Sequence, residues 1–153
     1  MRFSEAGMLT PEERLEQLES VFLELEEESK RTPIIVEGRK DEVALDLLGV
    51  RSNVVTLSKG MSIFAFCENI SRTSKRAIVL TDWDKKGGRL ARMLKEALNA
   101  NGVEVDSEIR ARLVILSKKE VKDIEGLPPF VSRLRSMMEG RRQMPGLRYG
   151  KRI

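Results

Sequence analysis

Three carboxylates follow short apolar runs in this chain, at places where buried strands would end. Glu37 comes directly after the run 34–36, and Asp82 and Asp84 come after the run 77–81. If the chain is still extended at 82–84, the two aspartates point to the same side and can share one cation. Carboxylates this close repel one another. Mg²⁺, or alternatively Mn²⁺, relieves that repulsion while keeping positions open for water and phosphate. The spacing therefore predicts a metal and phosphate site.

Basic residues and glycines flank these carboxylates. A single turn with Asp and Gly would be structural more often than not, but two acidic turns at strand ends favour a ligand site. A helix that begins at 87–88 would offer backbone N–H groups and its positive dipole end to a phosphate. The residues predicted to bind phosphate or nucleic acid are Gly38, Arg39, Lys40, Lys59, Lys85, Lys86, Gly87, Gly88 and Arg89.

The elements that must position these residues alternate along the chain. Apolar runs at 33–37, 54–57 and 77–81 predict buried strands, and an amphipathic helical pattern follows each of them. Residues 103–105 could be a strand end or a loop, and 112–116 predicts another strand. The alternation predicts an α/β fold with a mainly parallel sheet of about four strands and helices on both faces. Ligands bind such sheets beyond the carboxyl ends of the strands, where the three carboxylates would lie.

An additional helix is predicted before the first strand. The sequence 10–13, Thr-Pro-Glu-Glu, is a capping box, and Leu15, Leu18, Phe22 and Leu25 form one apolar stripe on the helix that follows. The stripe could pack against the core of the chain, or it could contact a second copy or a larger protein complex. We expect an N-terminal amphipathic helix at 1–31, a globular domain at 32–138 and a basic tail at 139–153.

The composition narrows the chemistry. The chain has no histidine and one cysteine, Cys67, which excludes Ser-His triads, His- or Cys-rich zinc sites and internal disulfides. No apolar run is long enough to span a membrane, and the N-terminus lacks the layout of a signal peptide, so we expect a cytoplasmic protein. The net charge is +4, and the tail carries Arg141, Arg142, Arg148, Lys151 and Arg152. Such a tail favours a phosphate-rich partner, although a solvated end would have the same composition.

Two segments together resemble the Toprim domain, which bacterial DNA primases, type IA and type II topoisomerases, OLD-family nucleases and the ribonuclease that matures 5S rRNA share. The segments are Val-Glu-Gly-Arg-Lys-Asp at 36–41 and Asp-Trp-Asp-Lys-Lys-Gly at 82–87. The resemblance spans about 32–116, and the family members closest in size are the small stand-alone Toprim proteins of archaea and bacteria. It implies a three-layer α/β/α, Rossmann-like fold.

The resemblance also implies roles for individual residues. Glu37 matches a glutamate that acts as general acid or base or helps to hold metal, and Asp82 with Asp84 matches the Mg²⁺-binding pair. Gly38 and Gly87 match turns that let phosphate approach. Lys59 is a candidate phosphate contact only. Asp41 is less closely matched: several family members carry an acid near the glutamate turn, which implies an auxiliary acid here, but Asp41 could equally complement the dipole of its own helix.

These roles predict Mg²⁺-dependent chemistry on the phosphodiesters of RNA or DNA. The only tyrosine is Tyr149, in the tail, so the covalent tyrosyl mechanism of topoisomerases is not expected. Hydrolysis by a metal-activated water makes a small nuclease the simplest enzymatic function. The alternative is a non-catalytic nucleic-acid-binding or adaptor module within a larger RNA-processing, replication or repair complex. Phosphate-accepting receivers and aspartyl phosphatases carry their paired acids after the first strand, which this chain does not.

Overall fold

The computed structural model of the chain describes residues 9–57, 59–117 and 119–143. Most of the predicted basic tail, with Tyr149, lies outside the described residues. The described elements are α1 (Pro11–Ser29), β1 (Ile34–Val36), α2 (Arg39–Leu47), β2 (Val54–Thr56), α3 (Ile63–Thr73), β3 (Arg76–Val79), α4 (Lys85–Ala100), β4 (Glu104–Asp106), α5 (Glu108–Ser117), the 3₁₀ turn η2 (Ile124–Gly126) and α6 (Leu127–Gln143).

The four strands form one parallel sheet in the order β2-β1-β3-β4. Ile35 of β1 is in register with Val55 of β2 on one side and with Val79 of β3 on the other. The predicted mainly parallel sheet of about four strands is confirmed. Because β1 and β3 are neighbours, the turns that follow them lie next to each other at the carboxyl edge of the sheet.

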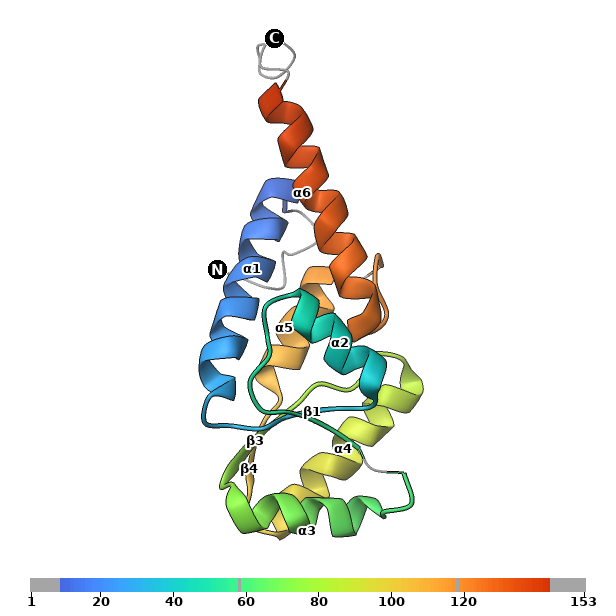
Figure 1. Cartoon of the computed structure of the whole chain (residues 1–153). Coiled ribbons are helices and arrows are strands. Elements are labelled where there is room, and N and C mark those ends of the chain that lie inside the picture. Colours follow the sequence, from blue (N-terminus) through green and yellow to red (C-terminus); the bar gives the residue numbers. More distant parts are fainter. Residues whose placement is uncertain (1–8, 58, 118, 144–153) are drawn as a thin grey trace.

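Helices cover both faces of the sheet, as the alternating elements predicted. Ile34 and Val36 point into a core shared with α1, α2, α5 and α6, whereas Ile35 points into a second core shared with α3 and α4. Figure 1 shows the same division, with α3 and α4 below the strands and α1, α2 and α5 above them. Successive strand residues therefore feed opposite layers, and the fold is the expected three-layer α/β/α arrangement.

Helix α1 begins at the predicted capping box. The Thr10 hydroxyl accepts a hydrogen bond from the Glu13 N–H at 3.1 Å, and the Glu13 carboxylate accepts one from the Thr10 N–H at 2.9 Å. The predicted stripe is buried in the core of the chain itself, where α1 packs against α5 and α6. The alternative, a dimer or complex contact through this stripe, is therefore left without support.

Helix α6 packs its buried residues, Leu127, Val131 and Leu134 among them, into the core that α1 shares. Its C-terminal half extends away from the rest of the described chain (Figure 1). Neither α6 nor any other helix of the described ranges is both long and apolar enough to cross a membrane.

The prediction of a strand at 112–116 is wrong, because these residues belong to helix α5. The fourth strand is instead β4 at 104–106, the segment that the sequence left open between strand and loop. Asp106 ends that strand and its Oδ1 accepts hydrogen bonds from the N–H groups of Glu108 and Ile109 at 2.9 and 3.2 Å. This side chain cap begins the helix, and Ile109, Leu113 and Leu116 then form a buried helical face.

Candidate metal and phosphate site

The structure brings Glu37 and Asp82 together at the carboxyl edge of the sheet. They follow the neighbouring strands β1 and β3, and Glu37 Oε2 accepts a hydrogen bond from the Asp82 backbone N–H at 2.9 Å. Both side chains are half-buried. This bond occupies one oxygen of Glu37 and leaves Oε1 for another ligand.

Asp82 carries the strongest electrostatic signal of the site. Burial, followed by the charges of Glu37, Asp41 and Asp123, raises the pKa of Asp82 to about 7, although a hydrogen bond from the Ile124 backbone opposes the rise. Its Oδ1 is buried and has no hydrogen-bond partner in the structure. A buried carboxylate oxygen without a donor is costly unless a proton or a cation binds it. Asp82 is therefore suited to act as a ligand of a hard divalent cation.

Asp84 lies at the N-cap of α4 and is exposed. Its Oδ1 accepts a hydrogen bond from the Gly87 N–H at 2.7 Å, so Asp84 caps the helix with one oxygen and keeps the other available. Among the residues that the structure describes, no group of three or more acidic, histidine or cysteine side chains is arranged to hold a metal ion. Mg²⁺ commonly uses one or two carboxylates plus waters and substrate phosphates, which the pair Glu37 and Asp82 can satisfy.

Gly87 is fixed by close packing of α4 against the Asp82 turn. A Cβ at residue 87 would lie 1.9 Å from the Asp82 carbonyl oxygen, and the Thr81 hydroxyl donates to the Gly87 carbonyl at 2.7 Å. By contrast, a Cβ at Gly38 or Gly88 would meet nothing within 4 Å. Gly87 therefore has a structural reason to be glycine, in addition to the phosphate approach that the family resemblance implied.

Asp41 serves the first turn of its own helix. It is 5% exposed, and its Oδ2 accepts a hydrogen bond from the Gly38 N–H at 3.1 Å. Burial raises the pKa of Asp41, the bond from Gly38 lowers it, and the carboxylates of Glu125, Glu37 and Asp123 raise it again. Of the two roles that the sequence left open, helix capping is the one with a contact in the structure.

The predicted cationic residues all lie on the surface at three turns of the same sheet edge. Arg39 and Lys40 begin α2, Lys59 lies between β2 and α3, and the rest begin α4; the full set is Arg39, Lys40, Lys59, Lys85, Lys86 and Arg89. Arg39 is paired with Glu42 at 3.4 Å. Exposed cations beside half-buried carboxylates fit a site that receives a phosphate from solvent.

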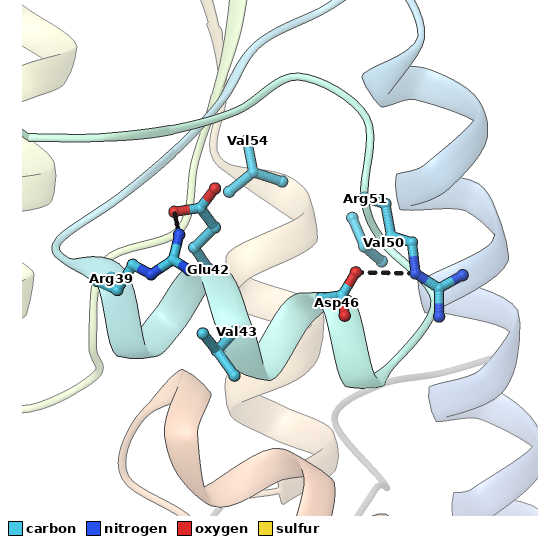
Figure 2. Close-up of a pocket in the computed structure, with 7 residues that line it drawn as sticks. All are labelled: Arg39, Glu42, Val43, Asp46, Val50, Arg51 and Val54. Atoms are coloured by element: carbon cyan, nitrogen blue, oxygen red, sulfur yellow. Dashed lines mark hydrogen bonds and ion pairs between the residues drawn. The ribbon is translucent and has the colours of Figure 1, made fainter.

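A small cavity of about 220 Å³ is lined by residues of α2, of the segment that leads to β2 and of β2 itself (Figure 2). Val43, Val50 and Val54 line it together with two ion pairs, Arg39 with Glu42 and Arg51 with Asp46. None of the three candidate carboxylates lines it. The cavity therefore does not extend the Glu37–Asp82 site.

Arg110 is a residue of the site that the sequence did not reveal. It lies on α5, and its Nε and Nη2 donate to the carbonyl oxygens of Thr81 and Asp82 at 2.9 and 2.6 Å. Burial lowers the pKa of Arg110, whereas the charges of Asp82, Glu37 and Asp84 raise it. The helical spacing of Ile109, Leu113 and Leu116 was the signal that could have placed Arg110 on a helix facing the sheet.

The segment before α6 also contacts the turn that carries Asp82, which the sequence did not predict. The Trp83 backbone N–H donates to the Lys122 carbonyl at 3.0 Å, and its indole Nε1 donates to the Val121 carbonyl at 2.9 Å. Asp123 caps η2 by accepting from the Gly126 N–H at 2.9 Å. The charge of Asp123 also raises the pKa of Asp82, so the site contains an acid that the sequence did not predict, in addition to Glu37, Asp82 and Asp84.

Comparison with known proteins agrees with the α/β fold. A family model described as Toprim-like matches residues 34–125. A UPF0292 protein of Methanosarcina acetivorans is 41% identical over 124 residues, which cover 80% of this chain and 85% of that protein. A UPF0292 protein of Methanocaldococcus jannaschii is 33% identical, with 80% and 95% covered. The solved structure of a putative protein from Aquifex aeolicus has a TM-score of 0.62 at 29% identity, over 72% of this chain and 97% of that one. The chain belongs to the Toprim-like family.

Proposed function

We propose that this chain is a Mg²⁺-dependent nuclease that hydrolyses phosphodiester bonds of RNA or DNA. The family match supports a metal-dependent function related to nucleic acids. The observation that best supports nuclease activity is the contact between Glu37 and Asp82, together with the buried Asp82 Oδ1, which has no hydrogen-bond partner. A carboxylate in this state is suited to bind a cation that a phosphodiester substrate can also contact.

In this proposal Asp82 Oδ1 is the principal metal ligand, and the second is Glu37 Oε1, which the hydrogen bond from the Asp82 N–H leaves unused. Asp84 remains the cap of α4, because no three acidic side chains of the described residues are arranged to hold one metal ion. Bound Mg²⁺ would polarise the phosphate and lower the pKa of a coordinated water. The exposed cations at the three turns would bind the phosphates on either side of the scissile bond. Glu37 would hold the metal or move a proton.

The test is cleavage of labelled RNA and DNA by the purified protein with Mg²⁺, with Mn²⁺ and with EDTA. Cleavage should require the metal and should be lost in Glu37→Gln. This substitution removes the charge but keeps an oxygen that can accept from the Asp82 N–H. The matched control is Glu42→Gln, which changes an acid of the same helix region that pairs with Arg39 instead. Equal cleavage by the parent and Glu37→Gln would contradict the proposal.

A second function, binding to nucleic acid without turnover, is favoured by one specific observation. The described residues contain no cluster of three or more metal-binding side chains, whereas the six exposed cations gather at one edge regardless of metal. A binding module would bind RNA or DNA with an affinity that falls steeply as salt rises, because phosphate contacts release counterions.

For that second function we expect replacement of Lys85 and Lys86 by glutamine to reduce the slope of log affinity against log salt. The reduction should be about 1.8 for a duplex, since each phosphate contact contributes about 0.9. Fluorescence anisotropy at several salt concentrations would measure it. The control is Lys30→Gln, because Lys30 follows α1 and pairs with Glu27. An unchanged slope would show that these two lysines do not contact phosphate.

A further inference from the structure

Arg110 joins helix α5 to the turn that carries Asp82. Its guanidinium donates from Nε to the Thr81 carbonyl at 2.9 Å and from Nη2 to the Asp82 carbonyl at 2.6 Å. The residues are 28 and 29 positions apart in the sequence. The helix itself is anchored by Ile109 and Leu113, which are buried in the core. Arg110 is therefore a rigidly held donor on a separate element.

Other contacts hold the same turn from other directions. The Asp82 N–H donates to Glu37 Oε2, and Gly87 of α4 packs directly on the Asp82 carbonyl. The next peptide is fixed by the bond from the Trp83 N–H to the Lys122 carbonyl. Of these contacts, only those of Arg110 bridge two successive carbonyls, which belong to the 81–82 and 82–83 peptides, so Arg110 holds the two peptide planes on either side of the Asp82 Cα relative to each other.

We propose that Arg110 is a positioning residue that aims the Asp82 carboxylate at a divalent cation. The inference rests on the proposed metal site and adds the residue that orients its main ligand. A planar guanidinium can donate along two parallel directions at once, whereas the ammonium of lysine is a single point donor. Groups that orient a metal ligand typically change metal affinity about 10–100-fold when they are replaced.

A different role for Arg110 would be purely electrostatic. A cation beside Asp82, Glu37 and Asp84 offsets their mutual repulsion, and it would also repel an incoming metal ion. In that role Arg110→Lys would behave as the parent, and Arg110→Met would bind metal more tightly. If Arg110 instead positions Asp82, Arg110→Lys should bind metal more weakly than the parent, because lysine keeps the charge but cannot donate to both carbonyls in the same way.

The experiment is calorimetric titration of the full chain with Mg²⁺, and with Mn²⁺ as a second probe, at a temperature well below the melting temperature of each variant. Arg110→Lys should bind about 10–100-fold more weakly than the parent. The matched control is Arg112→Lys on the same helix, where the arginine pairs with Glu24 at 2.8 Å, and its metal affinity should be unchanged. Where cleavage is measurable, kcat should fall in Arg110→Lys while KM for the nucleic acid stays constant. If Arg110→Lys does not fold, Arg110→Gln takes its place with the same expectation.

The first two of three outcomes separate this inference from the nuclease proposal. Parent-like metal affinity in Arg110→Lys, even with a lower melting temperature, would overturn the positioning role and leave the nuclease proposal standing. Weakened metal binding in a protein that cleaves nothing would support the positioning role and remove the nuclease. A parent that binds neither Mg²⁺ nor Mn²⁺ would overturn both.

Discussion

Replacement of Asp82 by asparagine should raise the melting temperature of the metal-free protein at pH 8 and should abolish its response to Mg²⁺. Asparagine keeps the size of the side chain but removes the charge that burial and the neighbouring carboxylates disfavour. The negative charge of Asp82, which a metal ligand needs, therefore destabilises the folded chain when no metal is bound. Opposite signs for stability and metal binding are the signature of a ligand site, because a purely structural aspartate would lose stability on the same change.

The pH dependence follows from the direction of the shift. The pKa of Asp82 is raised from 3.8 to about 7 on folding, so between these values the folded state holds more protons than the unfolded state. Stability from this group is fully present below pH 3.8 and is lost as pH rises through about 7. After a discount for its half-exposed position, the parent should lose about 1–2 kcal/mol over this range, roughly 2–8 °C in melting temperature.

Thermal unfolding of the metal-free proteins at pH 5 and pH 8 measures this effect. The advantage of Asp82→Asn over the parent should be present at pH 8 and much smaller at pH 5. The control is Asp46→Asn, an exposed acid paired with Arg51, which should change stability by less than about 1 kcal/mol at either pH. Addition of Mg²⁺ should raise the melting temperature of the parent at pH 8 but not that of Asp82→Asn. A lower melting temperature for Asp82→Asn at pH 8 would contradict the electrostatic account.

The sequence predicted the sheet edge correctly because the relevant signals are local. A continuous branched run such as 34–36 reads as a buried strand, and parallel strands bring their following turns to one edge whatever the rest of the chain does. This is why Glu37 and Asp82, which are 45 positions apart, could be expected to meet. The run 113–116 was misread for the related reason that four consecutive apolar residues fit a buried strand and a buried helix equally well.

The parts of the site that the sequence missed depend on contacts between distant elements. Arg110 has no neighbouring motif, and its partners become visible only when α5 is placed above β3. Asp123 reads as an ordinary turn residue, because capping is what it does locally. For Asp41 the sequence allowed two roles, an auxiliary acid or a partner of its own helix. Its burial and the hydrogen bond that it accepts from the Gly38 N–H, which only the structure shows, favour the second role.

Replacement of Gly87 by alanine should destabilise the protein strongly, whereas the same change at Gly88 should not. A Cβ at 87 would lie 1.9 Å from the Asp82 carbonyl oxygen, an atom of the backbone that several contacts hold in place. Relief requires α4 or the Asp82 turn to move, and overpacking of this kind costs about 3 kcal/mol. At Gly88 a Cβ meets nothing within 4 Å, and alanine should stabilise the helix by up to about 1 kcal/mol.

The two alanine variants also distinguish the two reasons for a glycine at 87. If the residue were small only to let a phosphate approach, Gly87→Ala would weaken substrate binding and leave the melting temperature and the metal affinity unchanged. If it is small because α4 packs on the Asp82 turn, the melting temperature should fall by about 6–12 °C. The Mg²⁺ affinity should fall with it by about tenfold or more, since the main ligand is displaced. Thermal unfolding and calorimetry on Gly87→Ala, with Gly88→Ala as the control, distinguish the two explanations. One is that residue 87 is small to let a phosphate approach, and the other is that it is small to let α4 pack on the turn that positions Asp82.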